Sequence, residues 1–573
     1  MSTELRRARS RQMVIFLLGC SGMIILLGRL YYWQVWQSGP LTQLANNEHI
    51  ANQILNAPRG LIYDAEGHLL ATNVVRDDVY IAPLQFASDF GNDPAQLFTE
   101  IHALHQVLPS VSEDQLNNDF GLSLQAVRIA EQIDPSQSQK LHNLHLPDIF
   151  LEPETWRIYP NDDLASQILG YTQNGKGIYG IEAKYDKLLA GKAGSFRAET
   201  DLNGNPLTVG ASSEQDPVRG ADLTLTVDSF IQYFVQNALQ NTVKQTDATS
   251  GTVVVLNAHT GAIIAMAGYP TFDPNHYSNF ADQKGCIGTE DVYLNPALFC
   301  DYEPGSTMKS VTMAAALDQH VITPDTSIDD PGYLNFSDGT PTVHNWNDNA
   351  YGKETMTQVL QHSANVGAAT VALWLGPNRF YPYLERFGFG QPIGLFDPED
   401  AGGYRTNTSV GWTNSDLTRQ AFGQSITASP LQVARAYQAI ANGGVMMQPY
   451  IVASINNNGH VVTTQPQMLR RVISAQAAQT LTGMLVSTAE YENIRLRYYS
   501  VAIKSGTATT QGLSMDQTEA SMAGFLPASS PQFVILVKID RPQKTIYGST
   551  AAGPLWGDIA QELVLHYSIV PDQ

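Results

Sequence analysis

Cysteine is scarce in this chain of 573 residues, which contains only Cys20, Cys286 and Cys300. No Cys-x-x-Cys pair and no cysteine–histidine spacing typical of zinc occurs, so the sequence predicts no structural zinc site. Two His-x-x-His pairs could share a helix face around a metal ion: His102 with His105, and His142 with His145. Because no cysteine or carboxylate cluster accompanies them, we interpret them as solvated or packed histidines and predict no metal.

A surplus of positive charge is missing as well. The 33 lysines and arginines are outnumbered by 54 aspartates and glutamates, which gives a net charge of −21. A nucleic-acid partner is therefore not expected, because phosphate backbones are bound by basic surfaces. No internal repeat of about 20–50 residues is evident, which argues against a solenoid. With 43% hydrophobic residues, a chain of this length is expected to form about two to four domains.

The N-terminus combines a basic leader with a long apolar run. Residues 1–11 carry four arginines and one glutamate, and the run Met13–Trp36 begins with sixteen residues that carry no charge. As a helix of ~36 Å, this run would cross a bilayer core of ~30 Å. Arg29 stands where a long side chain can reach the interface, beside an aromatic belt of Tyr31, Tyr32, Trp33 and Trp36.

A cleaved signal peptide is the alternative for this run. The run is long for a signal peptide and no small-residue cleavage site follows it, so we favour an uncleaved anchor. The arginines then predict a cytoplasmic tail at 1–12, a transmembrane helix at 13–36 and an extracytoplasmic remainder. Cys286 and Cys300 would lie in a compartment that permits disulfides, where a disulfide and two buried thiols both remain open.

The remainder is predicted to divide near residue 218. The first part is expected to contain a lightly helical stalk, a hairpin and a helical stretch, at 37–55, 57–73 and 92–150. Residues 175–220 are rich in glycine and polar turns, which indicates a boundary. We therefore expect two domains, at 37–217 and 218–573.

The second domain is expected to begin with a strand and an amphipathic helix at 220–239, followed by a hairpin at 250–268. Segments 498–510 and 531–540 have strand patterns, and a helix with one apolar face is expected at 551–567. Strands at both ends of the domain with helices between them predict a sheet covered by helices rather than alternating parallel units.

A serine and a lysine stand one helical turn apart in EPGSTMKS, which contains the only Ser-x-x-Lys of the chain. Pro304 and Gly305 favour a turn into a helix, where Ser306 and Lys309 would share a face. If Ser306 capped this helix, the positive end of its dipole would favour an attacking alkoxide. A neutral Lys309 could then take the serine proton. Alone, the pair is also typical of an ordinary surface helix.

Two further motifs follow along the chain. Ser363 and Asn365 form a Ser-x-Asn, although Ser454-Ile-Asn456 fits the same pattern. The only Lys-[Ser/Thr]-Gly starts at Lys504, on a predicted strand whose glycine would let a peptide substrate approach closely. Each motif alone also fits a structural role, as a surface lysine, a helix-cap serine or a strand glycine.

In this order and spacing the three motifs resemble those of the penicillin-binding proteins. The resemblance extends along nearly the whole chain. The stretches APRGLIYDAEG and GKGIYGIE resemble motifs of the class B, monofunctional members, and RIYPNDDLASQILGY resembles the segment between them. Pieces similar to the transpeptidase domain are GAIIAMAGYPTFDPN, GQSITASPLQVARAYQAIANGG and YGSTAAGPLWGDIA.

The resemblance implies an α/β (α+β) fold, with an elongated pedestal and a transpeptidase domain whose five-stranded antiparallel sheet is sandwiched by helices. It implies a peptidoglycan D,D-transpeptidase of bacterial cell-wall synthesis, which crosslinks stem peptides through a serine acyl-enzyme, releases D-alanine and needs no cofactor. β-Lactams would acylate the same serine. The enzyme would lie in the inner (cytoplasmic) membrane beside a SEDS (RodA/FtsW-type) glycosyltransferase, in elongation or in division.

Carried over onto this chain, the resemblance assigns catalytic roles to four residues. Ser306 would attack the carbonyl between the last two D-alanines, and Lys309 would be its general base. Ser363 would relay the proton to the leaving amine, and Lys504 would hold the terminal carboxylate and raise the local positive potential.

Substrate-binding roles fall on four more residues. Asn365 would contact the substrate amide, and the hydroxyls of Ser505 and Thr507 would hold the terminal carboxylate, with Gly506 between them. The backbone N–H groups of Ser306 and Thr507 would form an oxyanion hole, in which losing one donor typically costs ~10²–10³-fold in rate.

Two other functions remain open, a D,D-carboxypeptidase that passes the acyl group to water and a non-catalytic β-lactam-binding scaffold. A class A β-lactamase is less favoured, because its Glu-x-x-Leu-Asn segment has no match after Ser363. The chain also departs from the family pattern. Ser505 replaces the commoner threonine, 276–299 has the character of an insertion, and LVSTAEYENIRLRYYSVAIK lacks the expected glycine-rich approach to the third motif.

Overall fold

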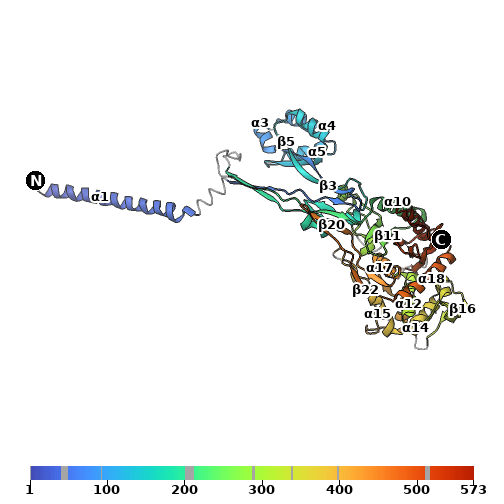
Figure 1. Ribbon diagram of the computed structural model, residues 1–573. Helices are drawn as coiled ribbons and strands as arrows, with labels where there is room; N and C mark the ends of the chain where they lie inside the picture. The colour runs from blue at the N-terminus through green and yellow to red at the C-terminus, as the bar shows by residue number, and fades with distance from the viewer. Residues whose placement is uncertain are drawn as a thin grey trace. The chain divides into compact units, whose positions relative to one another are not determined.

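The computed structural model describes residues 2–39, 50–91, 93–199, 212–286, 291–336, 340–396, 399–509 and 517–573 (Figure 1). The chain forms two compact units. The first comprises Met1–Pro58 with Gly191–Arg219, and the second comprises Arg59–Ala190 with Gly220–Gln573. The predicted domain boundary near residue 218 stays a prediction.

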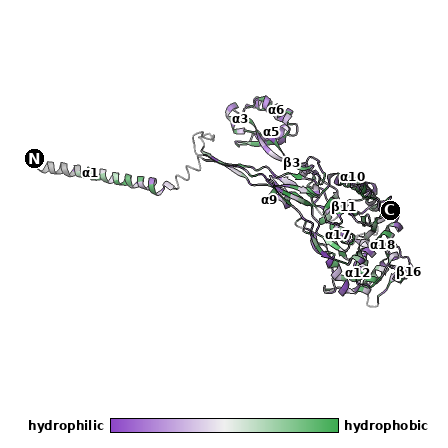
Figure 2. Ribbon diagram, viewed as in Figure 1, coloured by the Kyte–Doolittle hydropathy of each residue, from purple (hydrophilic) through white to green (hydrophobic). Residues whose placement is uncertain are grey.

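The first unit begins with a long apolar helix. Helix α1, Ser2–Tyr31, continues into a π-helical turn, η1, at Tyr32–Trp36. The 24 residues Met13–Trp36 are long and apolar enough to cross a membrane, and Figure 2 shows the hydrophobic colour along this helix. The helix fits a single-pass membrane anchor, as predicted.

A three-stranded antiparallel sheet, in the order β1-β8-β9, completes the first unit. Its strands are Ile50–Leu55 (β1), Gly194–Glu199 (β8) and Ser212–Gln215 (β9). The prediction of a lightly helical stalk over 37–55 is wrong at its C-terminal end, because Ile50–Leu55 pairs with β8 along its whole length. Residues 40–49 of that prediction lie outside the described residues. Pairing with a strand far along the chain overrides the weak local propensity.

In the second unit, β3 (Leu69–Ile81) pairs with β5 (Ile149–Ile158) and β4 (Val127–Ile133). Helices α3 to α6 share a hydrophobic core with these strands; they are Pro83–Phe90, Pro94–Val107, Glu113–Phe120 and Pro135–Leu144. The helices predicted within 92–150 are confirmed except at β4 and at the end of the range, where β5 begins at Ile149. At β4 the chain pairs antiparallel with β3, a distant strand that overrides the local helical pattern.

The predicted hairpin at 57–73 is confirmed, because β2 (Ile62–Tyr63) pairs antiparallel with the start of β3. On its other side β2 pairs in parallel with β10 (Asp222–Leu225). The same sheet continues through β20 (Val452–Asn457) to β21 (His460–Thr463). Strands from the two halves of the chain therefore share one sheet.

The second unit also contains an antiparallel sheet of five strands, in the order β12-β11-β25-β24-β23. The strands are Ile263–Tyr269 (β12), Ser250–Asn257 (β11), Phe533–Asp540 (β25), Thr518–Leu526 (β24) and Ala502–Thr509 (β23). This confirms the predicted mixed α/β fold. Strand β23 lies at one edge of the sheet, so it is the strand to which an extended peptide could be added.

Helices cover both faces of this sheet because both faces are apolar. Val253 and Val255 belong to one buried cluster, while Val254 and Leu256, which point the other way, belong to a second. The predicted helix α10 (Ser229–Thr246) and the C-terminal helix α20 (Gly553–His566) pack in the first cluster. Fully burying each such side chain stabilises the fold by about 1.5–3 kcal/mol.

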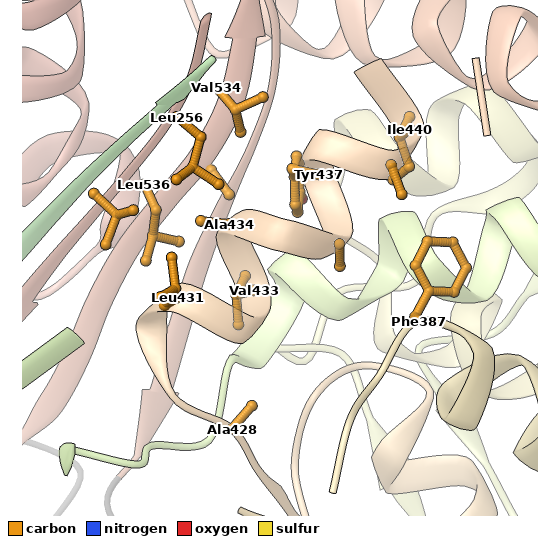
Figure 3. Close-up of a cluster of buried hydrophobic side chains, with 14 of the residues drawn as sticks. Leu256, Phe387, Ala428, Leu431, Val433, Ala434, Tyr437, Ile440, Val534 and Leu536 are labelled. Atoms are coloured by element: carbon orange, nitrogen blue, oxygen red, sulfur yellow. The ribbon is translucent and has the colours of Figure 1, made fainter. Parts of the chain in front are cut away.

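Helix α17, Pro430–Ala441, covers the other face. Figure 3 shows Leu431 and Ala434 of this helix beside Leu256, Val534 and Leu536 of the sheet. These side chains are fully buried. Helix α17 is therefore fixed against the sheet and can position the elements on its far side.

Helix α12, Met308–Asp318, lies among the other helices, in contact with α14 (Asn365–Leu375), α17 and α18 (Ala475–Tyr491). All of its residues up to Leu317 are buried. The hydroxyl of Tyr437 in α17 donates to the Thr307 carbonyl at 3.0 Å and shares a hydrogen bond with the Ser310 hydroxyl at 2.8 Å. These contacts fix the start of α12.

Cys286 and Cys300 form a disulfide, one of the two states that the sequence leaves open. Cys300 follows the short helix α11, Pro296–Phe299, and precedes Ser306 by six residues. The bridge therefore ties the segment before the first motif to the predicted insertion at 276–299.

Candidate active site

Lys309 connects the first two motifs. Its Nζ lies 2.9 Å from Ser306 Oγ, 3.2 Å from Ser363 Oγ and 2.8 Å from Asn365 Oδ1. The same nitrogen lies 2.5 Å from the backbone oxygen of Ser363. The other Ser-x-Asn, Ser454 to Asn456, lies on β20 and pairs with β10 in the seven-stranded sheet, apart from these contacts.

The turn that carries Ser306 depends on a glycine. Gly305 opens a 3-10 turn, η3 (Gly305–Thr307), with a φ of +57°, a conformation that favours glycine. A Cβ at Gly305 would lie 2.9 Å from the carbonyl oxygen of Thr507, so the first motif lies against the third. Ser306 precedes α12 and makes no capping hydrogen bond, so the conditional expectation of a helix cap is wrong. Its hydroxyl is left to Lys309.

The hydrogen-bond partners of Lys309 determine which atom its lone pair can bind. The Ser363 carbonyl and Asn365 Oδ1 are acceptors only, so they take two N–H groups of the amine. A neutral amine has two such groups and one lone pair. The lone pair is then left for a hydroxyl proton, and the Ser306 hydroxyl, 2.9 Å away, can donate it.

The surroundings of Lys309 favour the neutral amine. The side chain is completely buried, and this burial lowers its pKa well below the usual 10.5. The positive charge of Lys504 lowers the pKa further, while Glu354 and Glu492 act in the opposite direction. Burial is the largest of these effects. Lys309 therefore loses its proton at lower pH than an ordinary lysine, which favours a role as proton acceptor.

The second motif lies between α13, Met356–Gln361, and α14. Ser363 has a φ of +55°, an uncommon conformation for a residue other than glycine. Asn365 is the first residue of α14, and its Nδ2 donates to the His344 carbonyl at 3.0 Å. This contact turns Asn365 Oδ1 toward Lys309.

Asp330 and Glu354 form a buried acidic pair next to the second motif, and the sequence patterns did not predict it. Asn345 links this pair to α14, because its Nδ2 donates to Asp330 and its Oδ1 accepts from the N–H of Val366. Burial and the neighbouring Asp330 raise the pKa of Glu354 to about 8. Glu354 therefore keeps its proton at neutral pH, and it opposes the lowered pKa of Lys309 only at the higher pH where it ionises.

The third motif lies on β23, where a residue outside the predicted site joins it. Lys504 is fully buried, and its Nζ lies 3.1 Å from Glu492 Oε1. The Ser505 hydroxyl donates to the same oxygen at 2.8 Å. Glu492 falls within the stretch that departs from the family pattern, which is the only signal of it in the sequence.

Thr507 and Gly506 lie further along β23. The hydroxyl oxygen of Thr507 accepts a hydrogen bond from the N–H of Gly548 at 3.0 Å, which leaves the proton of Thr507 available for a ligand. Gly506 has no room for a side chain, since a Cβ would lie 2.8 Å from the Pro304 carbonyl oxygen. The third motif is thus packed directly against the turn that leads to Ser306.

The arrangement combines a hydroxyl, a neutral amine beside it and a buried cation close by. Such a site can form an ester on Ser306. Two family models match the chain. The penicillin binding protein transpeptidase domain matches residues 251–561, and the penicillin-binding protein dimerisation domain matches residues 54–225.

Individual relatives match over most of their length. The chain is 32% identical to the penicillin-binding protein PbpB of Mycolicibacterium smegmatis over 464 residues, which cover 77% of this chain and 70% of PbpB. It is 28% identical to the peptidoglycan D,D-transpeptidase FtsI of Escherichia coli K12 over 571 residues, covering 97% of this chain and 92% of FtsI.

A solved structure agrees in fold. The crystal structure of penicillin-binding protein 3 from Mycobacterium tuberculosis, complexed with aztreonam, matches with a TM-score of 0.68 and 25% identity, and covers 91% of this chain and 98% of that chain. The transpeptidase match alone spans more than half of the sequence. The chain belongs to the penicillin-binding proteins, as a class B member with a dimerisation and a transpeptidase domain.

Proposed function

We propose that this protein is a peptidoglycan D,D-transpeptidase that acts through an acyl-enzyme on Ser306. The observation that carries the proposal is the position of Lys309 Nζ, 2.9 Å from Ser306 Oγ and between two carbonyl oxygens. The relatives named as D,D-transpeptidases support the substrate class, a stem peptide that ends in D-Ala-D-Ala.

In the acylation step, Ser306 Oγ attacks the carbonyl carbon between the two D-alanines, and its proton passes to Lys309 Nζ. The carbonyl oxygen becomes an oxyanion, which the N–H groups of Ser306 and Thr507 would stabilise. The C–N bond then breaks. The proton reaches the leaving amine through Ser363, whose hydroxyl lies 3.2 Å from Lys309 Nζ, and D-alanine departs.

In the second step, the amine of a neighbouring stem peptide attacks the ester carbonyl. Its proton passes to the Lys309 amine, and the bond to Ser306 Oγ breaks as the serine regains a proton. The product is a new amide between two stems. A β-lactam enters by the same first step, because opening its ring breaks the corresponding C–N bond, and the ring-opened product stays on Ser306.

In the cell, we place the apolar helix α1 in the inner membrane, with the basic N-terminal residues in the cytoplasm and the catalytic domain outside. The arginines of the leader support this orientation. The family resemblance further supports a SEDS (RodA/FtsW-type) glycosyltransferase as the partner that supplies glycan strands. We therefore expect this protein to form a complex with such a glycosyltransferase in the membrane.

A crosslinking assay with the full-length protein in detergent tests the proposal. The substrates are a donor peptide that ends in D-Ala-D-Ala and an acceptor that carries a free amine. The expected result is one D-alanine released for each crosslink, and neither product from a folded Ser306→Ala variant. D-Alanine without crosslinks would indicate a carboxypeptidase. Penicillin binding without any turnover would indicate a scaffold, and either result would overturn the proposal.

A further inference from the structure

The carboxylate of Glu492 lies on the third motif. Its Oε1 accepts hydrogen bonds from Lys504 Nζ at 3.1 Å and from the Ser505 hydroxyl at 2.8 Å. The side chain of Glu492 is 8% exposed and that of Lys504 is 0% exposed. Glu492 Oε2 is buried and has no hydrogen-bond partner among the residues that the structure describes. Glu492 and Lys504 therefore form a buried ion pair inside the candidate site.

The helix next to Glu492 does not explain this position. Glu492 follows Tyr491, the last residue of α18, and its N–H donates to the Thr488 carbonyl at 2.9 Å. A helix C-terminus carries partial negative charge, which disfavours a carboxylate there. The contacts that hold the Glu492 side chain are those with the third motif.

Glu492 thus occupies Lys504 Nζ and the Ser505 hydroxyl, the hydrogen-bond donors that a substrate carboxylate would need. The Ser505 hydroxyl has a single proton, so it cannot donate to a ligand while it donates to Glu492. The charge of Lys504 is already balanced by Glu492, and a second carboxylate in this buried space would repel the first. Thr507 keeps its proton, because its oxygen acts as the acceptor for Gly548.

We propose that Glu492 is a specificity-determining residue, an internal carboxylate that competes with the carboxylate of the acyl donor for Lys504 and Ser505. A donor or β-lactam with a free carboxylate must displace Glu492 or bind beside its charge. A donor whose carboxylate is replaced by a neutral amide does neither. This inference rests on the proposed function, since it assumes that ligands acylate Ser306 with their carboxylate at the third motif.

The test compares two acyl-D-alanyl thioesters whose thiol leaving groups differ only in ending in a carboxylate or a carboxamide. Ser306 Oγ attacks the thioester carbonyl, the C–S bond breaks, and the thiol leaves with a proton and is measured. The readout is the ratio of kcat/KM for the carboxylate donor to kcat/KM for the amide donor. A general change in the reactivity of Ser306 or Lys309 alters both values and cancels in this ratio.

Replacing Glu492→Gln removes the charge and keeps the size of the side chain. The ratio should rise about tenfold, the effect of removing a nearby like charge worth about one pKa unit. The matched control is Glu490→Gln, an exposed glutamate at the end of the same helix, and it should leave the ratio unchanged. Ser505→Ala should change the ratio little in the native protein, where Glu492 already uses the serine proton, and lower it clearly in the Glu492→Gln background.

Removal of the charge leaves Lys504 without its counter-ion, so Glu492→Asp provides a second variant that keeps the charge and shortens the reach to Ser505. It should raise the ratio by a smaller factor, and thermal unfolding checks that each variant is folded. An unchanged ratio in folded Glu492→Gln or Glu492→Asp would overturn the inference while leaving the proposed function intact. Failure of the native protein to react with either thioester would instead overturn the proposed function.

Discussion

The amine of Lys309 lies 2.9 Å from the hydroxyl oxygen of Ser306, and two carbonyl oxygens occupy its N–H groups. This relationship makes the neutral amine the reactive form. Burial and the charge of Lys504 lower the pKa of Lys309 well below 10.5, so the neutral form is available without high pH.

Acylation should therefore show an acid limb that reports the lowered pKa of Lys309. The second-order rate constant with a fluorescent penicillin should rise with pH and level off well below pH 10.5, because the lowered pKa lets Lys309 lose its proton before an ordinary lysine would. Measurement over about pH 5–10 in a constant-ionic-strength buffer gives the profile. A rate that continued to rise tenfold per pH unit up to about pH 10 would show an ordinary lysine and contradict the assignment.

Replacing Asn365→Asp should move this acid limb to higher pH. The new carboxylate would lie near the Lys309 amine, which is now 2.8 Å from Asn365 Oδ1, and a nearby negative charge favours the protonated form. The expected shift is about one pH unit or more, with a loss of rate at neutral pH that alkaline pH partly restores.

The control for this variant is Asn458→Asp, which adds the same charge in the exposed turn between β20 and β21. Its pH profile should match that of the native protein. A profile for Asn365→Asp that keeps the native midpoint would show that Asn365 does not adjoin the titrating group.

Replacing Gly305→Ala should slow acylation strongly and lower the stability of the fold only moderately. The left-handed backbone costs an alanine ~1–2 kcal/mol, and its Cβ would lie 2.9 Å from the Thr507 carbonyl oxygen, so the turn that carries Ser306 must shift. A displacement of about 1 Å in a reacting group can cost ~10²-fold in rate. Penicillin acylation and thermal unfolding measure the two effects separately.

Gly557→Ala is the matched glycine substitution, since Gly557 lies within α20 and its Cβ would meet open space. It should raise stability by about 0.5–1 kcal/mol and leave acylation unchanged. Native-like acylation by Gly305→Ala would mean that the turn tolerates a side chain and does not determine the position of Ser306.

Loss of the bridge between Cys286 and Cys300 should destabilise the catalytic unit. The bond joins residues 14 positions apart in the sequence, for which a chain-entropy estimate gives ~3 kcal/mol. The variant Cys286→Ser with Cys300→Ser should show a lower free energy of unfolding in denaturant. Cys20→Ser, which replaces the exposed cysteine in α1, should not change it. Equal stability of the double variant and the native protein would indicate that the bridge contributes nothing to folding.

Elements with a strong local pattern could be predicted from the sequence. The hairpins around Asp64 and Asn257, the helix α10 and the three motifs each carry their signal within a few neighbouring residues. Strand β1 carries no such signal, because its partner β8 lies more than 100 residues away. The spacing of apolar residues within a segment does not reveal a pairing with a strand that is distant in the sequence.

The residues of the site also differ in how well the sequence predicts them. Ser306 and Lys309 are predictable because one helical turn joins them. Glu492 is close to Lys504 in sequence, but its contact depends on how α18 packs against β23, which no motif records. Glu354 is likewise hidden, because its raised pKa comes from burial beside Asp330, a residue on a separate strand.

The most direct test of the central claim is the identity of the residue that a penicillin modifies. Full-length protein is incubated with benzylpenicillin, and the adduct is located by mass spectrometry of its peptides. We expect one covalent adduct carrying the whole ring-opened antibiotic on the peptide that contains Ser306, and no adduct in a folded Ser306→Ala variant. An adduct on another residue, or none on folded native protein, would contradict the account.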